Sequence, residues 1–255
     1  MVGACTSELA EHGNLWLLLE YCPYGDLKNY LKSNRDKIIN GKDDDEINSR
    51  IIIKWTYQIL NGMQYLSENH IMHGDLAARN ILLDDDLFGN HCPIAKISDF
   101  GLSKRFYDNI TYEKGSRLLV PWKWMALEYL INDYFTLTSD VWSFGVLFWE
   151  LLSFGRTPYG QQDYDELIEK LKSGYRLSCP HEINQIISWK PKELFQNLSE
   201  ICFKADPMER ASFSEVLTRI EKELTVEEIS HYEQMSEKYR STLSSRYSRL
   251  SVIER

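Results

Sequence analysis

The stretch that decides the fold reads HGDLAARN at residues 73–80, and it is followed by DFG at residues 99–101. Asp75 and Asn80 lie on a segment too polar and punctuated to form a regular element, and Asp99 follows a short apolar run. Carboxylate and amide oxygens are hard ligands that suit Mg²⁺, which proteins hold with few groups. A further carboxylate that does not touch the metal can accept a hydroxyl proton. Either string alone could be a chance turn, but together and in this order they indicate a metal-assisted site.

Apolar patterns on both sides of these strings predict the elements that hold them. Residues 81–83 and 94–97 predict two short strands joined by a hairpin. The stretch VWSFGVLFWELL at residues 141–152 is apolar nearly all round, which is typical of a helix in the centre of a domain. Residues 51–66 predict another helix, because they carry apolar side chains at helical spacing, namely Ile52, Trp55, Ile59, Met63 and Leu66. Further helices are expected over residues 27–32, 163–172, 192–203 and 213–224.

The remaining segments carry weaker signals. Residues 15–20 (LWLLLE) predict a buried strand, whereas residues 34–49 are polar and acidic and predict a solvated insert. From Asp99 to Pro121 no period is visible, so a long mobile loop is expected. Beyond Thr225 the composition turns polar, which predicts a loosely held tail.

Composition bounds the class of protein. With 255 residues, 43% hydrophobic and 26% charged, the chain is an ordinary globular one, and no apolar run approaches the ~20 residues of a membrane span. The net charge of −9 argues against a general binder of nucleic acid or anionic membrane. Five scattered cysteines without a CxxC pair indicate reduced thiols rather than disulfides or a zinc site. The N-terminal residues do not have the pattern of a signal peptide.

The two strings resemble the catalytic loop and the metal loop of eukaryotic protein kinases, H-R-D-L-x-x-x-N and D-F-G. The AAR at residues 77–79 resembles tyrosine kinases in particular. Similar matches run over nearly the whole chain: EYCPYGDL at 20–27, PWKWMALE at 121–128, SDVWSFG at 139–145 and CFKADPMERASF at 202–213. The chain is identified by these matches as a member of the receptor-type protein tyrosine kinases, in the group of the platelet-derived, vascular and fibroblast growth factor receptors.

The resemblance implies an α+β protein kinase-like fold, mostly the helical C-terminal lobe with only the last strands of the N-terminal lobe. Residues 1–224 would form the kinase domain, with a short polar insert at 33–49, and residues 225–255 a polar, tyrosine-containing tail without fixed structure. The sequence has no G-x-G-x-x-G loop, no lysine-bearing V-A-I-K strand and no helix carrying its partner glutamate. We therefore expect an N-terminally truncated kinase domain.

The resemblance assigns roles to the polar residues of both loops. Asp75 would be the base that orients and deprotonates the substrate hydroxyl, and Arg79 would position Asp75 and the incoming phenol. Asn80 and Asp99 would hold the Mg²⁺ ions that bridge the phosphates of ATP. Protein tyrosine side chains would be the substrate, received on a platform built by Pro121 and Trp124.

Adenine would be bound by the hinge. The resemblance places Leu19 at the gatekeeper position, the backbone of Glu20 and Cys22 against adenine, Gly25 just after the hinge, and Leu82 beneath the ring.

Structural and regulatory roles follow in the same way. Asp140 would brace the catalytic-loop backbone, and Glu128 would pair with Arg210; the loss of such a pair, if buried, could cost ~3–5 kcal/mol. His73 of the catalytic-loop motif and Phe100 of the metal-loop motif would likewise have structural roles.

Four further residues are tied to phosphotyrosine signalling by the resemblance. Tyr107 and Tyr112 lie in the activation loop, where autophosphorylation is expected. In the tail, Tyr232 and Met235 fit Y-x-x-M, a docking pattern for phosphotyrosine-binding adaptors, although a pattern this short in a tyrosine-rich segment also arises by chance.

The chain also departs from the family pattern. Gly74 replaces the arginine of H-R-D, which implies weaker dependence on activation-loop phosphorylation. Leu127, Phe203 and Ala211 replace a proline, a tryptophan and a proline of the later motifs and indicate packing variants. Two functions stay open: an ATP-dependent tyrosine kinase of receptor signalling, or a catalytically inactive pseudokinase that serves as a scaffold. The parent protein would lie in the plasma membrane and dimerise, with this domain on the cytoplasmic side.

Overall fold

The computed structural model describes residues 3–5, 16–41, 48–85, 92–105, 120–186 and 189–250. Its contacts divide the chain into two units: Tyr24–Leu224, and Met1–Pro23 together with Thr225–Arg255. Each unit is described by itself.

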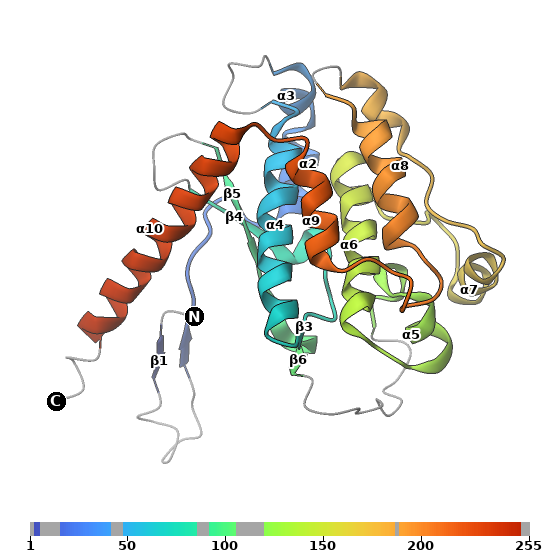
Figure 1. Cartoon of the computed structure of the whole chain (residues 1–255), viewed down its shortest axis with the longest axis horizontal. Helices are drawn as coiled ribbons and strands as arrows, with labels where there is room; N and C mark the ends of the chain where they lie inside the picture. The colour runs from blue at the N-terminus through green and yellow to red at the C-terminus, as the bar shows by residue number, and fades with distance from the viewer. Residues whose placement is uncertain are drawn as a thin grey trace. The chain divides into compact units, whose positions relative to one another are not determined.

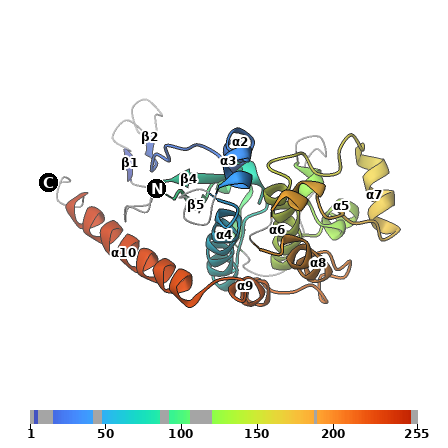
Figure 2. The same cartoon turned by 90° about the horizontal axis from the view of Figure 1, so that it is seen from above.

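Two long helices form the centre of the larger unit. Helix α4 (Ile51–Glu68) and helix α6 (Leu137–Leu152) lie side by side, with α9 (Phe213–Glu221) packed on α4 and α8 (Pro191–Cys202) on α6 (Figures 1 and 2). The five side chains of the predicted apolar stripe on α4 are all buried, which confirms the helical reading of that segment. Burial of such a stripe, rather than helix propensity, supplies most of the stability of a helix in a protein.

Helix α6 is buried over every residue from Ser139 to Leu152, as its uniform apolar pattern predicts. A Cβ atom on Gly145 would lie 2.8 Å from the ring of Phe203, so the glycine lets that ring approach the helix backbone. The same ring packs against Trp142 with centroids 5.2 Å apart. The departure from tryptophan at position 203 is therefore accommodated by aromatic packing on α6.

Side-chain caps fix where the helices begin. Asp26 accepts a hydrogen bond from the backbone of Asn29 at the start of α2 (Leu27–Ser33), and Asp163 does so for Glu166 in α7 (Tyr164–Lys172). Helices α6 and α9 each begin with a reciprocal capping box, formed by Thr136 with Ser139 and by Ser212 with Glu215. Each cap satisfies backbone N–H groups that have no partner inside the helix.

The insert is more ordered than its polarity predicts. Residues 34–49 were expected to be a solvated loop, but helix α3 (Arg35–Asn40) forms inside the segment and buries Ile38 completely. Ile38 supplies the buried side chain that a solvated loop would lack. The acidic run at residues 43–46 lies outside the described residues.

Short elements connect the central helices to the site. Strand β4 (Ile81–Asp84) pairs antiparallel with β5 (Ile94–Ile97), which confirms the predicted hairpin, and β3 (Ile71–Met72) pairs with β6 (Lys104–Arg105). The hairpin packs on α4, where the Trp55 indole donates to the carbonyl of Pro93 at 2.7 Å. The other short elements are η1 (Ala78–Asn80), η2 (Phe100–Leu102), η3 (Trp122–Trp124), α5 (Leu127–Asn132) and η4 (His181–Gln185).

In the smaller unit, β1 (Gly3–Cys5) pairs antiparallel with β2 (Trp16–Leu18). A strand was predicted at residues 15–20, but its expected burial is wrong at the C-terminal end, where Leu18 and Leu19 are exposed. The tail contains helix α10 (Val226–Leu250) instead of an irregular segment. Its first turn is capped reciprocally, because Thr225 and Glu228 each accept a hydrogen bond from the other's backbone N–H.

None of the helices in the part of the chain that the structure describes combines the length and the apolar character needed to cross a membrane.

Candidate active site

Asp75 is held in place by two neighbours on its own loop. The Arg79 guanidinium donates to Asp75 Oδ1, while Asn80 Nδ2 donates to Oδ2 at 2.8 Å and to the Asp75 carbonyl at 2.7 Å. Burial raises the pKa of the Asp75 carboxyl, and the charge of Arg79 and the hydrogen bond from Asn80 pull it back down. The direction of this carboxylate is therefore fixed by the loop itself.

His73 is a structural joint between the two loops. Its Nδ1 accepts a hydrogen bond from the Asp75 N–H at 3.2 Å, so Nε2 carries the ring proton and donates it to the Ser98 carbonyl at 3.0 Å. Burial lowers the pKa of the His73 imidazole, which favours this neutral form. The ring also lies 5.2 Å from the Phe100 ring, between centroids.

Asp140 braces the catalytic loop from helix α6. Its Oδ2 accepts from the His73 N–H at 2.7 Å, and its Oδ1 accepts from the Gly74 N–H at 3.0 Å. The side chain is almost fully buried, and this burial raises the pKa of Asp140 to about 7. The structure thus brings Asp140 to the backbone that the resemblance assigned to it.

Glu150 is a functional residue that the sequence analysis missed. One of its oxygens, Oε2, accepts from the Ala78 N–H at 2.9 Å and from the Trp124 indole at 2.8 Å. The Arg79 guanidinium lies over the Trp124 ring, 4.5 Å from its centroid. The signal was available, because Glu150 is the only charged residue in the apolar run 141–152, and a buried charge needs partners.

Two serines join the catalytic loop to the metal loop. The backbone N–H and the hydroxyl of Ser98 both donate to the Asn80 carbonyl, at 2.9 and 2.8 Å. The hydroxyl of Ser103 donates to the His73 carbonyl at 3.0 Å. Neither serine carries a pattern that sequence reasoning could have used.

The metal loop itself is open to solvent. Asp99 has φ of 59° in the left-handed region, and among the described residues its side chain accepts one long hydrogen bond, from the Gly101 N–H at 3.3 Å. Phe100 is 49% exposed and Leu102 is also exposed. Asp99 is therefore positioned mainly by its backbone.

The oxygens that these loops present fit a magnesium ion. Asn80 uses its amide nitrogen on Asp75, and its Oδ1 makes no hydrogen bond to the residues that the structure describes. The Asp99 carboxylate is exposed. An amide oxygen and a carboxylate are hard donors of the kind that Mg²⁺ takes, with water and phosphate completing the shell. The described residues contain no group of three or more His, Cys, Asp or Glu side chains that could hold a metal ion.

Gly74 occupies a conformation that favours glycine. Its φ is 78°, and a Cβ atom there would lie 3.0 Å from the Leu102 carbonyl oxygen. A side chain at this position would therefore meet both backbone strain and a close contact with the metal loop.

Glu128 and Arg210 form a buried two-pronged ion pair. Arg210 Nη1 and Nη2 donate to the two Glu128 oxygens at 2.7 and 2.9 Å, and the Ser139 hydroxyl donates to Oε1 at 2.7 Å. Arg210 also donates to the carbonyls of Thr138 and Lys204. The expected pair is present, and it ties α5 to the start of α6.

The residues assigned to adenine fall in different units. Gly25 and Leu82 lie together in the larger unit. The Leu83 N–H donates to the Gly25 carbonyl at 2.9 Å, and the backbones of Asp26 and Leu82 form an isolated antiparallel β-bridge. Leu19, Glu20 and Cys22 belong to the smaller unit. Their role as a hinge stays a prediction.

The tyrosines tied to signalling have separate outcomes. Tyr107 and Tyr112 lie outside the described residues. Tyr232 and Met235 lie on α10, where Met235 is buried.

Comparison with known proteins places this geometry in context. A family model described as protein tyrosine and serine/threonine kinase matches residues 1–220. A fibroblast growth factor receptor of Ciona intestinalis is 33% identical over 234 residues, 88% of this chain and 29% of the receptor.

Two further relatives give similar values. The tyrosine kinase receptor Cad96Ca of Drosophila melanogaster is 35% identical over 230 residues, 89% of this chain and 27% of the receptor. The myoblast growth factor receptor egl-15 of Caenorhabditis elegans is 34% identical over 248 residues, 89% of this chain and 22% of the receptor. The chain thus spans less than a third of the length of the curated relatives it matches.

Proposed function

We propose, from the premise that this chain belongs to the protein tyrosine kinase family, that it carries the catalytic half of a domain that transfers the γ-phosphate of ATP to protein tyrosine. The observation that carries the proposal is that Arg79 and Asn80 both donate hydrogen bonds to the Asp75 carboxylate and fix its orientation. A carboxylate fixed in this way is ready to accept a proton from a substrate hydroxyl. The pseudokinase alternative is not favoured, since Asp75, Asn80 and Asp99 are all retained.

Each residue has a defined part in this mechanism. Asp75 accepts the hydrogen bond of the tyrosine hydroxyl and takes up its proton as the phosphate is transferred. Arg79 keeps Asp75 in place and, from its position over Trp124, borders the place of the incoming ring. Asn80 and Asp99 would hold Mg²⁺, which supplies charge neutralisation of the phosphates when bound.

Trp124 and its neighbours form the platform for the substrate tyrosine in this proposal. The Trp124 indole donates a hydrogen bond to Glu150 Oε2 at 2.8 Å, and the Ser143 hydroxyl donates to the Trp124 backbone carbonyl at 2.8 Å. The Trp124 ring is buried under the Arg79 guanidinium, so its part would be to support Arg79 at the place of the incoming phenol ring.

The test is radiolabelled phosphate transfer from Mg²⁺/ATP to a tyrosine peptide, with the full gene product and the 255-residue chain assayed side by side. Asp75→Asn should lower the rate about 10²–10⁴-fold, the usual contribution of a general base. Asp133→Asn, an exchange of the same type at a helix end away from the site, is the matched control. Unchanged transfer in Asp75→Asn, or none from the unaltered full gene product, would overturn the proposal.

We further propose that the parent protein is a receptor of the plasma membrane that dimerises, with this domain on the cytoplasmic side. The receptor relatives support this. Binding of the purified full gene product to detergent micelles tests the membrane location. Its mass by light scattering tests the dimerisation.

Phosphotyrosine docking at Tyr232 is a separate proposal. Tyr232 and Met235 stand three residues apart on α10 and share one side of that helix. A synthetic phosphopeptide covering residues 228–240 should bind isolated phosphotyrosine-reading domains that select methionine three positions on. Equal binding of the unphosphorylated peptide, or none of the phosphopeptide, would end the idea.

A further inference from the structure

Ser98 lies between the two residues that are proposed to hold Mg²⁺. Asp99 follows it directly in the chain, and Asn80 is the last residue of η1. Ser98 donates twice to the Asn80 carbonyl, from its backbone N–H at 2.9 Å and from its hydroxyl at 2.8 Å. One serine therefore connects the backbones of both proposed ligands.

The carbonyl of Ser98 makes a third link, which runs to the proposed base. It accepts a hydrogen bond from His73 Nε2 at 3.0 Å, and His73 Nδ1 accepts one from the Asp75 N–H at 3.2 Å. This link does not use the Ser98 hydroxyl. Loss of the hydroxyl alone therefore leaves the connection to Asp75 in place.

Asp99 depends on the preceding backbone more than Asn80 does. Asn80 is buried, and its side chain donates to the Asp75 carboxylate and carbonyl. Asp99 is exposed, and among the described residues its side chain accepts one long hydrogen bond, from the Gly101 N–H. The place of the Asp99 carboxylate relative to Asn80 is therefore set largely by the peptide that joins it to Ser98.

The two donors of Ser98 restrict that peptide in different ways. With the N–H bond alone, residue 98 can still turn about the line that joins its nitrogen to the Asn80 oxygen. The hydroxyl bond to the same oxygen opposes this turn, because it ties the side chain of residue 98 as well as its backbone. Groups behind a metal ligand orient it in this manner and so change the affinity for the metal.

We propose that Ser98 is a positioning residue for the pair of metal ligands. Its hydroxyl sets the position of the Asp99 carboxylate relative to the Asn80 amide and thereby strengthens the binding of a divalent cation. The inference rests on the proposed function in taking Asn80 and Asp99 as the ligands; the contacts of Ser98 do not depend on it.

Binding of the cation is measured directly, without phosphate transfer. The probe is Mn²⁺, which takes the same oxygen ligands as Mg²⁺ and whose free form is counted by electron paramagnetic resonance. The full gene product is titrated with Mn²⁺ at a fixed concentration of ADP, which supplies phosphate oxygens, and a titration of ADP alone is subtracted. Ser98→Ala should weaken the Mn²⁺ affinity about tenfold, the lower end of what groups behind metal ligands contribute.

Two further variants assign the effect to the hydroxyl. Ser98→Thr keeps a hydroxyl and should bind Mn²⁺ as the unaltered protein does. Ser98→Cys keeps the size of the side chain but has only a weak S–H donor, so it should behave as Ser98→Ala. If Ser98→Ala does not fold, the comparison of Ser98→Cys with Ser98→Thr decides.

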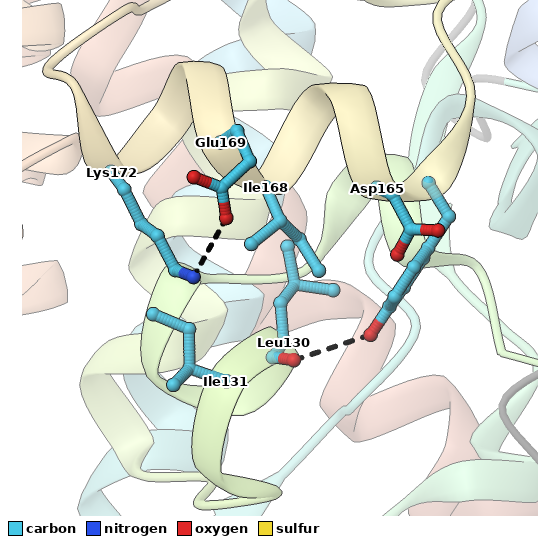
Figure 3. Close-up of a pocket in the computed structure, with 7 residues that line it drawn as sticks. Leu130, Ile131, Asp165, Ile168, Glu169 and Lys172 are labelled. Atoms are coloured by element: carbon cyan, nitrogen blue, oxygen red, sulfur yellow. Dashed lines mark hydrogen bonds and ion pairs between the residues drawn. The ribbon is translucent and has the colours of Figure 1, made fainter.

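The matched control removes the same kind of hydrogen bond away from the two loops. The Ser173 hydroxyl donates to the Lys170 carbonyl at 2.8 Å at the end of α7. Figure 3 shows this helix beside α5, with Lys172, the residue before Ser173, near its end. In Figures 1 and 2, α7 lies at the far end of the larger unit from β4 and β5. Ser173→Ala should therefore leave the Mn²⁺ affinity unchanged.

Phosphate transfer by the full gene product gives an independent readout. Ser98→Ala should raise the Mg²⁺ concentration for half-maximal rate about tenfold. The rate at saturating Mg²⁺ and the pH profile of the rate should change little, because the link from the Ser98 carbonyl through His73 to Asp75 remains. A merely structural role would lower the rate and the thermal stability without moving the Mg²⁺ dependence, and that result would overturn the proposal.

The outcomes separate this inference from the proposed function. Unchanged Mn²⁺ affinity in Ser98→Ala, or an equal loss in Ser98→Thr or Ser173→Ala, overturns the role of the Ser98 hydroxyl even if phosphate transfer is found. Weaker Mn²⁺ binding in Ser98→Ala that Ser98→Thr restores supports this role even if the unaltered protein transfers no phosphate, a result that would remove the kinase proposal alone.

Discussion

The catalytic loop and the metal loop both carry residues that the proposed reaction needs, but they are built very differently. Around Asp75, helix α6 supplies two buried carboxylates, Asp140 and Glu150, that accept four hydrogen bonds from the loop and the platform. At Asp99, the side chain accepts one long hydrogen bond from the described residues, that of the Gly101 N–H at 3.3 Å, and Phe100 is half exposed. The first region is held by buried carboxylates of α6, whereas the second presents its carboxylate to solvent.

This difference separates effects on activity from effects on stability. A residue of the catalytic loop region is part of the packed interior, so changing it disturbs both. A residue of the metal loop can be essential for the reaction and still contribute little to folding.

The largest expected effect is on phosphate transfer. Asp99→Asn should lower transfer at least about a hundredfold, because a metal ligand contributes several kcal/mol to the barrier. The free energy of unfolding should change by less than about 0.5 kcal/mol, since Asp99 is exposed. Transfer rates of the full gene product and urea unfolding of the 255-residue chain measure the two. A clear loss of stability would erase the contrast between the loops.

The second test removes the buried ion pair between Glu128 and Arg210. Arg210→Leu should destabilise the chain by about 3–5 kcal/mol, because it leaves the buried Glu128 carboxylate without its ion-pair partner. The double change with Glu128→Leu should recover most of that loss, which distinguishes a stranded charge from lost packing. The change in the free energy of unfolding is measured from the midpoints of urea unfolding, provided that the m-value stays constant. Equal losses in the single and double variants would contradict the explanation.

A smaller effect is expected where α6 meets the loop. Asp140→Asn replaces one of two acceptors by a donor, so one backbone N–H of residues 73–74 loses its partner, at a cost of about 2 kcal/mol. Transfer should fall together with stability. Chemical denaturation and the transfer assay on the same variant test the link, and Asp133→Asn serves as the control. Reduced stability with full activity would show that the brace is not part of the catalytic geometry.

The joint between the loops should respond to pH. Burial lowers the pKa of His73 in the folded state, so below about 6.5 the unfolded chain binds a proton that the folded chain does not. Stability therefore falls as pH drops through this range, by at most about 1.4 kcal/mol per pH unit for one group. Subtracting the pH profile of His73→Gln isolates the contribution. Parallel profiles for the two proteins would exclude it.

The smallest effect on stability is expected in the exposed metal loop, at Phe100. Phe100→Ala should cost less than about 1 kcal/mol, because the ring is already half in water. Phe144→Ala, in the buried face of α6, should cost about 3–5 kcal/mol. Thermal and urea unfolding of both variants test the ratio. Similar costs would mean that the metal loop is as well packed as the core.

Helix positions could be predicted from the sequence because they depend on local patterns. The stripe on α4 and the uniform burial of α6 follow directly from the spacing of apolar residues. Helix α10 could have been predicted as well, since Thr225 and Glu228 fit a capping box, but the polar composition was given more weight. Helix α3 was missed because its single buried residue, Ile38, gives no periodic signal.

The site could be predicted only in part. The roles of Asp75, Asn80 and Asp99 came from a motif, and the pairing of Glu128 with Arg210 from the resemblance, since no local rule joins residues so far apart. Ser98 and Ser103 could not have been found, because their contribution is one hydroxyl each at a place that the fold decides.

The single oxygen that Glu150 shares between Ala78 and Trp124 has a consequence for how substitutions combine. Since one acceptor serves both donors, a shift of the platform also alters the bond that holds the loop. Changes at Trp124 and at Glu150 should therefore be non-additive, as expected of residues that share a partner. Under the proposed function, substrate preference and turnover would then change together under mutation, because Trp124 and the Ala78 N–H of the catalytic loop share one Glu150 oxygen.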